Sequence, residues 1–262
     1  MASGRFVLSW QEYDFLWEHL ELGPRKPILN IDSHGYTFDE RAELRAEAWK
    51  TLARKGFGEP ANVNSTLERC LKVLARPEWE LDARLHLSAD GPRTSALIGA
   101  AGSRAAVGVL DATAFTVWPT APTGLTRAAV DLLPAHPPGG GVSITLPAET
   151  LDRCAARAGA DADALRRALV SAGLGRAEAR KITEVVGNVI RFGHIGAAHT
   201  PRHAARYRAD HVVSFYDHPL GRYLFSRRPS NGQQWVTLAP GTTAAITAQI
   251  DELLAGLAGV SG

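Results

Sequence analysis

The sequence predicts an α+β protein built as a pseudo-two-fold repeat of one arrangement. Two observations carry this prediction. Proline and glycine cluster without an apolar period in LLPAHPPGGGVS, residues 132–143, and divide the 262 residues into nearly equal halves. Each half then shows the same order of a short strand, helices, a run of strands and a closing helix. The apolar content of 45% is enough to bury a substantial core.

The first half, residues 1–134, opens with a short strand at 5–9 that leads into an amphipathic helix at 11–20. Further helices are predicted at 39–55 and 63–75. Four strand-like runs and a last helix complete this half: WELDARLHL, RTSALIGAAG, RAAVGVL, AFTVWP and PTGLTRAAVDLL.

A linker rich in proline and glycine at 135–141 precedes the second half, residues 142–262, which again opens with a short strand, at 142–146. In both halves a strand ends at a proline, and a threonine is placed to cap the last helix. We therefore expect the halves to share one central antiparallel sheet as a single globular unit. The second half continues with helices at 148–158, 161–172 and 176–187, then VIRFGHIGAA, HVVSFYD, GRYLFSRR, QQWVTLAP and the closing GTTAAITAQIDELL.

The charge of the chain is small but unevenly distributed. The net charge is +2 at pH 7, which excludes a strongly basic polyanion binder. Residues 191–228 nevertheless hold seven Arg and two Asp, with no Glu or Lys, so we expect a local basic surface. Cys70 and Cys154 are too few for a disulfide framework or a zinc site, and the N-terminus reads as neither a signal peptide nor a membrane anchor. The expected compartment is the cytoplasm.

No familiar catalytic or cofactor-binding pattern stands out in the sequence. The glycine-rich GAAGSRAAVG, residues 99–108, lacks the order of a phosphate-binding loop and predicts a hairpin turn. Tyr216, Asp217 and His218 precede a turn sequence, and neighbouring residues on a strand point to opposite faces, so they predict a hairpin tip. The five histidines between residues 194 and 218 match no metal motif. We therefore expect a protein that is not an enzyme and has no catalytic, cofactor or metal site.

The strand runs of the second half are both basic and aromatic, which leaves three readings open. Arginines interleaved with Tyr207, Tyr216 and Phe225 can form a nucleic-acid platform, whose binding would fall steeply with salt. The same residue types are enriched in protein–protein interfaces. An enzyme with a site assembled around the histidines is the third reading, and it predicts a deep pocket instead of a broad face.

Two stretches resemble a known family. LSWQEYDFLWEHL with GYTFDERAELRAEAWKTLARKG, and VVSFYDHPLGRYLFSRRPSNGQQWVTLAPGTTAAITAQIDELL, resemble the EspG family of cytosolic chaperones, which serve ESX secretion in mycobacteria and related actinobacteria. The resemblance extends over essentially the whole chain. It implies a central antiparallel sheet flanked by two helical bundles. It also implies binding of a PE–PPE heterodimer, or a similar helical-hairpin substrate of a type VII secretion system, by the helical tip of its PPE subunit.

By this resemblance the partner docks on one face of the central sheet together with the C-terminal helical bundle. The loop ADGPRT, residues 89–94, can reach toward the partner or be a plain exposed turn. Core packing is the alternative for each aromatic residue, and an ordinary surface helix for residues 176–188. Without a substrate, the exposed sheet face could pair with a second copy. The predicted contact residues are Asp90, Arg93, Arg180, Ile195, Phe215, Tyr223, Phe225, Arg227, Arg228 and Trp235.

Overall fold

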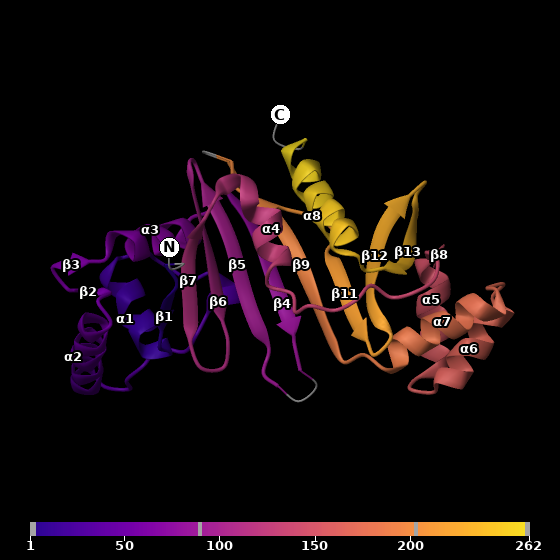
Figure 1. Ribbon diagram of the computed structural model, residues 1–262, viewed down its shortest axis with the longest axis horizontal. Helices are drawn as coiled ribbons and strands as arrows, with labels where there is room; N and C mark the ends of the chain where they lie inside the picture. The colour runs from indigo at the N-terminus through magenta and orange to yellow at the C-terminus, as the bar shows by residue number, and fades with distance from the viewer. Residues whose placement is uncertain (1–3, 89–90, 202–203, 260–262) are drawn as a thin grey trace.

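One antiparallel sheet runs through the molecule (Figure 1). The computed structural model describes residues 4–88, 91–201 and 204–259. The strands follow the order β1-β7-β6-β5-β4-β9-β11-β12-β13-β8, with β10 paired to β9, and β2 and β3 form a separate hairpin. The strands are β1 Phe6–Leu8, β2 Gly58–Glu59, β3 Asn62–Val63, β4 Trp79–His86, β5 Thr94–Ala101, β6 Arg104–Leu110, β7 Phe115–Thr120, β8 Ile144–Pro147, β9 Arg191–His199, β10 Tyr207–Arg208, β11 Val213–His218, β12 Gly221–Ser230 and β13 Gln233–Pro240.

Helices gather at both ends of this sheet and on one of its faces. Figure 1 shows α1–α3 at one end of the long axis and α5–α7 at the other, with α4 and α8 across the middle. The predicted α+β class, with a central antiparallel sheet between two helical bundles, is confirmed. The helices are α1 Trp10–His19, α2 Phe38–Arg54, α3 Ser65–Ala75, α4 Leu125–Val130, α5 Ala148–Ala158, α6 Ala162–Ser171, α7 Arg176–Gly187 and α8 Thr243–Ala258, with single 3-10 turns η1 Pro27–Leu29 and η2 Pro122–Gly124.

Side-chain caps fix several helix starts. Ser9 and Glu12 form a reciprocal capping box at α1, and the Thr242 hydroxyl accepts the Ala245 N–H at 3.1 Å as predicted. The corresponding threonine cap expected in the first half is wrong. There the turn η2 leads directly into α4, and its N-cap residue, Gly124, has no side chain to accept a hydrogen bond.

The sheet has the same order of elements when it is read inward from either edge. From one edge it runs β1, β7, β6, β5, β4, and from the other β8, β13, β12, β11, β9, so β4 and β9 meet in the middle. Each edge strand leads into helices, and each inner meander ends in a helix on the same face, α4 or α8. A duplicated half would give this order; the duplication itself stays a prediction.

The predicted linker is an ordered strap that crosses the end of β12. Arg222 donates its N–H to the Pro137 carbonyl at 2.7 Å, and its own carbonyl accepts the Gly139 N–H at 2.7 Å. The Arg222 guanidinium adds a third bond, to the Pro134 carbonyl at 2.8 Å. We call residues 134–141 the strap, because these bonds tie the connection between the halves to the sheet.

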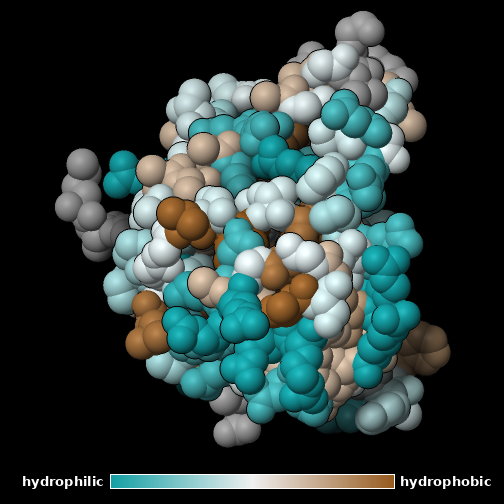
Figure 2. Space-filling view, turned by 90° about the vertical axis from the view of Figure 1, so that its right-hand side faces the viewer, coloured by the Kyte–Doolittle hydropathy of each residue, from teal (hydrophilic) through white to brown (hydrophobic). Residues whose placement is uncertain are grey.

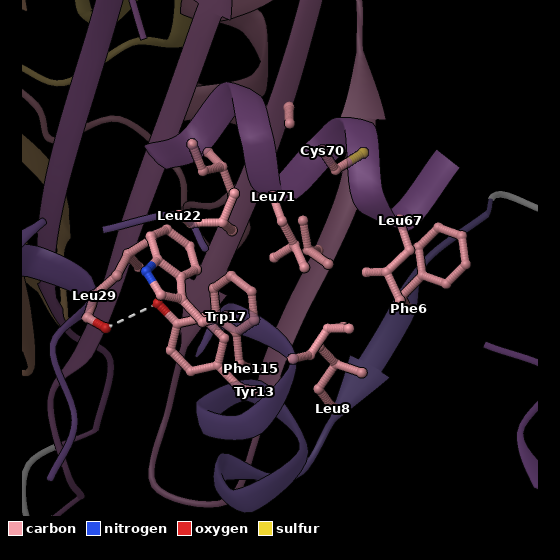
Figure 3. Packing of buried hydrophobic residues seen from close by; sticks show 14 of the residues in the cluster. Phe6, Leu8, Tyr13, Trp17, Leu22, Leu29, Leu67, Cys70, Leu71 and Phe115 are labelled. Carbon is pink, nitrogen blue, oxygen red and sulfur yellow. Dashed lines mark hydrogen bonds between the residues drawn. The ribbon is translucent and has the colours of Figure 1, made fainter. Parts of the chain in front are cut away.

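Three clusters of buried side chains hold the fold together, one for each helical layer. The cluster beneath α1 and α3 contains Tyr13, whose hydroxyl donates to the Leu29 carbonyl at 3.1 Å and whose ring stacks on Phe115 at 4.1 Å (Figure 3). A second cluster lies between the sheet and the helices α4 and α8, and a third beneath α5–α7. The first and third clusters lie at opposite ends of the sheet, and the part between them carries the candidate site.

Candidate protein-binding face

One face of the sheet is only partly covered between the two helical bundles. α4 contacts β4 and β5, and α8 contacts β9 and β11, all on one face. On the opposite face, α3 covers β5 to β7 and α5 covers β13 and β8. Between these two bundles, that opposite face presents exposed and half-exposed side chains. We call this surface the central face; it comprises Arg84, His86, Phe192, His194, Tyr216, Phe225 and Arg227.

A row of aromatic rings crosses three neighbouring strands of the central face. His86, Phe192 and Tyr216 lie opposite one another in register on β4, β9 and β11. The rings of His86 and Phe192 stack at 4.3 Å with an angle of 10° between their planes. Phe225 on β12 meets Tyr216 edge-on at 5.9 Å. Such pairs stabilise one another, so the row is a pre-arranged apolar surface.

A cavity of about 570 Å³ opens beside this row. Its walls are the chain at 208–212 on one side and the β12–β13 hairpin on the other. Tyr216, Phe225 and Val212 contribute apolar surface, and Arg227 lies at its edge. The cavity can therefore receive an apolar side chain of a partner that lies along the aromatic row.

Ion pairs hold one wall of this cavity onto the sheet. Arg206 donates to Glu80 at 2.6 Å, and Arg208 donates to both oxygens of Asp82 at 2.5 and 3.0 Å. The hydrogen bonds that Arg208 donates to Asp82 raise the pKa of its guanidinium. Gly196 leaves room for this pair, because a Cβ there would lie 2.4 Å from a guanidinium nitrogen of Arg208. The wall is thus positioned by charge-assisted bonds.

The arginines at 191–228, on which the expected local basic surface rests, form ion pairs in the part of the chain that the structure describes. Every described arginine in this range contacts a carboxylate of the same chain, and all but Arg222 pair with an acid that is distant in sequence. Arg202 lies outside the described residues. The pairs are Arg191–Asp217, Arg222–Asp217, Arg206–Glu80, Arg208–Asp82, Arg227–Asp152 and Arg228–Glu252. The arginines are thus tied into the fold. Because Asp217, Glu80 and Asp82 each contact two cations, some positive charge stays in excess, and the local basic surface stays a prediction.

A serine and a histidine are in contact on the central face. The Ser214 Oγ and His194 Nδ1 lie 2.8 Å apart. Burial lowers the pKa of His194, and the charges of His86 and Arg84 lower it further. A general base must become an imidazolium, and these surroundings disfavour that charge. Among the described residues, no group of three His, Cys, Asp or Glu side chains is arranged to hold a metal ion.

Three predicted contact residues lie in the core. Ile195 and Phe215 are each 1% exposed and pack beneath α8, while Tyr223 is 2% exposed beneath the C-terminal bundle. A buried side chain offers no area to a partner, so these three residues are corrected to core positions.

Four predicted residues on β12 and β13 divide between the two faces of the sheet. Phe225 and Arg227 belong to the central face, where Arg227 bonds Asp152 of α5 at 2.6 and 3.0 Å. Arg228 points to the other face and contacts Glu252 of α8 at 2.7 Å. Trp235 lies opposite Arg228 in register and shares that face. Only the first two residues are placed to meet a partner on the central face.

Arg180 is exposed on α7 within the C-terminal bundle and pairs with Glu184 of the same helix. A cavity of about 630 Å³ is lined by residues of α6 and α7, which include the arginines 166, 167, 176 and 180 and Val170. Figure 2 shows this end of the molecule as a mostly hydrophilic surface with small hydrophobic patches near its centre. This surface is open to a partner that extends from the central face onto the bundle.

The remaining predicted residues belong to the loop between β4 and β5. Arg93 is exposed and lines a cavity of about 720 Å³ together with His86 and Trp10. It therefore borders the central face at the N-terminal bundle. Asp90 lies outside the described residues.

The sequence analysis did not predict that His86 and His194 belong to a binding face, although the alternation of residues along their strands indicates it. In WELDARLH the polar residues alternate with leucine and alanine, which places His86 and Arg84 opposite the buried face. On β9 the same alternation places Phe192 and His194 on one face of the sheet and Ile195 on the other. Alternation along two neighbouring strands thus marks the central face.

Comparison with known proteins gives one family and one fold. A sequence model described as the EspG family matches residues 9–252. No curated protein sequence matches the chain. Among the solved structures that resemble it is the Mycobacterium tuberculosis type VII secretion system chaperone EspG5 in complex with a PE25–PPE41 dimer, with a TM-score of 0.75, 14% sequence identity and 95% of each chain covered. None of the described helices is long and apolar enough to span a membrane.

Proposed function

The chain belongs to the EspG family, and from this premise we propose that it is a cytoplasmic chaperone of a type VII secretion system. Its substrate is a PE–PPE heterodimer or a related helical-hairpin protein, which it binds by the helical tip and keeps in solution until export. The observation that carries the proposal is the family match over residues 9–252. The chaperone solved with PE25–PPE41 shares the fold of this chain.

The central face suits this role physically. An apolar helical tip left free in the cytosol would favour aggregation, because large exposed apolar patches seek partners. His86, Phe192 and Tyr216 present a broad aromatic row that can cover such a tip, and the cavity beside Phe225 can receive one of its side chains. Because the nearby arginines are already paired within the chain, the apolar centre should supply most of the affinity and the charged rim the orientation.

Co-purification tests the proposal. The tagged chain is co-expressed with the PE–PPE pairs of the same genome and run on size exclusion at low and moderate salt. We expect a stoichiometric complex that persists at moderate salt. Phe192→Ala and Phe225→Ala should each weaken it about tenfold, as truncation of an interface aromatic does. The matched control is Leu220→Ala, an exposed apolar residue at the β11–β12 turn that lies off the aromatic row.

Nucleic acid binding by the basic strands is the alternative that the same experiment separates. If nucleic acid co-elutes instead of a substrate and moderate salt removes it, the chaperone proposal is wrong. If a substrate binds but the Phe192 and Phe225 variants behave like the control, the function stands and its placement on the central face is wrong.

A further inference from the structure

Two aromatic side chains at the start of α2 are exposed to an unusual degree. Tyr36 is 100% and Phe38 96% exposed, the highest values among the large hydrophobic residues that the structure describes. They flank Thr37, which caps α2, and line none of the cavities of the central face. In Figure 1, α2 lies at the end of the molecule opposite α5–α7. An adjacent pair of fully exposed rings is a feature of interaction sites more than of ordinary surface.

The turn that displays these rings is rigidly built. The backbone of His34 is held on both sides, by its N–H to the Asp14 carboxylate at 2.9 Å and by its carbonyl to Arg41 at 2.6 Å. Gly35 follows with φ +90°, and a Cβ there would lie 2.9 Å from the Arg41 backbone. The Tyr36 N–H then donates to Glu40 at 2.8 Å. A partner would therefore meet the backbone that carries both rings already in place, which lowers the backbone entropy lost on binding.

The charge around the rings is negative. Asp39, Glu40 and Glu43 follow in the first turns of α2 and are all exposed. Of the two nearest arginines on α2, Arg41 turns inward to Asp14 and Glu18, and Arg45 pairs with Glu18. Lysine or arginine side chains complement this pattern twice, through the carboxylates and through the faces of the two rings. Anionic lipid and nucleic acid are disfavoured by the same carboxylates.

From the built turn, the exposed rings and the unbalanced acids, we propose that Tyr36 and Phe38 form a second protein-binding site. Its ligand is a segment of a partner protein that carries lysine or arginine beside apolar side chains. The site is separate from the central face and does not depend on the function proposed for that face. A chaperone with two such surfaces can hold one protein on the sheet while a basic segment occupies the far end.

Titration with synthetic peptides tests this site. The probe is an amphipathic leucine–lysine helix, and the comparison peptide replaces every lysine with glutamate. We expect the lysine peptide to bind the full chain and to perturb the ring resonances of Tyr36 and Phe38. A Tyr36→Ser/Phe38→Ser double variant should bind about tenfold more weakly, and Asp39→Asn/Glu43→Gln should bind more weakly with a smaller salt dependence.

The matched control is Val142→Ser/Leu220→Ser, which removes two exposed apolar side chains, 81% and 67% exposed, elsewhere on the surface. It should bind the lysine peptide like the unmodified chain, and all variants should keep its melting temperature. Equal binding by the control and the Tyr36/Phe38 variant would overturn the proposal, as would equal binding of the glutamate peptide. If removing the two rings abolishes self-association while peptide affinity is unchanged, the occupant is a second copy and the proposal is wrong.

Discussion

Asp217 and Arg222 form a buried ion pair at the closed end of the β11–β12 hairpin. The carboxylate of Asp217, 0% exposed, accepts the Arg222 Nε–H at 2.6 Å and the Nη2–H at 2.9 Å. Arg191 of β9 contacts the same carboxylate at 3.0 Å. Arg222 also holds the strap through its backbone and its guanidinium. Through its two arginine partners, the Asp217 carboxylate thus links β9, the β11–β12 hairpin and the strap.

Asp217→Asn should therefore destabilise the protein strongly. Removing this charge leaves two guanidinium groups near a buried neutral amide, and breaking a buried pair costs about 3–5 kcal/mol of unfolding free energy. Urea denaturation measures the loss. The control is Asp152→Asn, which breaks the more exposed pair with Arg227 and should cost no more than about 1 kcal/mol. If Asp217→Asn costs as little unfolding free energy as the control, the ion pair between Asp217 and Arg222 does not stabilise the fold.

Glycine 139 should be intolerant of a side chain, whereas its neighbour should accept one. A Cβ on Gly139 would lie 2.1 Å from the Tyr223 ring, while a Cβ on Gly140 would meet nothing within 4 Å. We expect Gly139→Ala to lower the unfolding free energy by about 1–3 kcal/mol, as overpacking does. Gly140→Ala serves as the control and should change it little. If the two variants are equally stable, the strap is not packed on Tyr223.

The stability of the N-terminal bundle should fall in acid because of Asp14. Burial by itself raises the pKa of this carboxyl, but hydrogen bonds from the His34 backbone, Arg25 and Arg41 outweigh it and hold the pKa below its usual value. The folded state therefore releases this proton more readily than the unfolded state. The stabilisation is complete above the unfolded value, about 3.9, and is lost as the pH falls through the folded pKa.

Unfolding free energies at neutral pH and at about pH 3 measure this effect, since that interval covers the unfolded pKa. Asp14→Asn should lower stability at neutral pH and reduce the difference between the two conditions. Glu43→Gln, at an exposed position of α2, should leave the difference unchanged. An Asp14 variant with the full acid sensitivity of the unmodified chain would contradict the assignment.

The strands were predictable from the sequence because apolar and polar residues alternate along them and glycine or proline marks the turns between them. In WELDARLH the leucines and the alanine point to one face, and Gly102 and Pro219 mark turns between strands. β6 and β13 were predicted with their observed bounds for the same reason. The local sequence pattern was therefore sufficient to predict the strands, whose positions depend on residues close together in sequence.

The candidate site could be predicted only in part, because it depends on contacts between distant residues. Phe215 and Tyr216 are adjacent aromatics on one strand, and only the packing of α8 buries the first and leaves the second half-exposed. The pair Arg206–Glu80 spans 126 residues and Arg227–Asp152 spans 75, so no local charge count could reveal that these arginines have acidic partners. Composition gave the residue types of the site but not their faces or partners.

His194 should remain neutral on the central face at physiological pH. Burial lowers its pKa, and the electrostatic interactions with His86 and Arg84 lower it further. An NMR titration of the ring should give a midpoint below the ordinary histidine value of about 6.5, and Arg84→Gln should raise it. Since the folded pKa is depressed, the associated stabilisation is complete above the ordinary value and is lost as the pH falls toward the folded one. An unshifted midpoint would contradict this environment.

The wall of the cavity at 208–212 should loosen when its ion pair is removed. The Ala209 N–H donates to the Ala197 carbonyl at 3.0 Å, and the preceding residue, Arg208, is held by two bonds to Asp82. Charge-assisted bonds of this kind contribute about 1.5–3 kcal/mol, so Arg208→Ala should speed amide exchange of Ala209 by about ten- to a hundredfold. Arg84→Ala is the matched control, because Arg84 has only one contact with Asp82, at 3.5 Å. Equal exchange in both variants would mean that the backbone alone holds this wall in place.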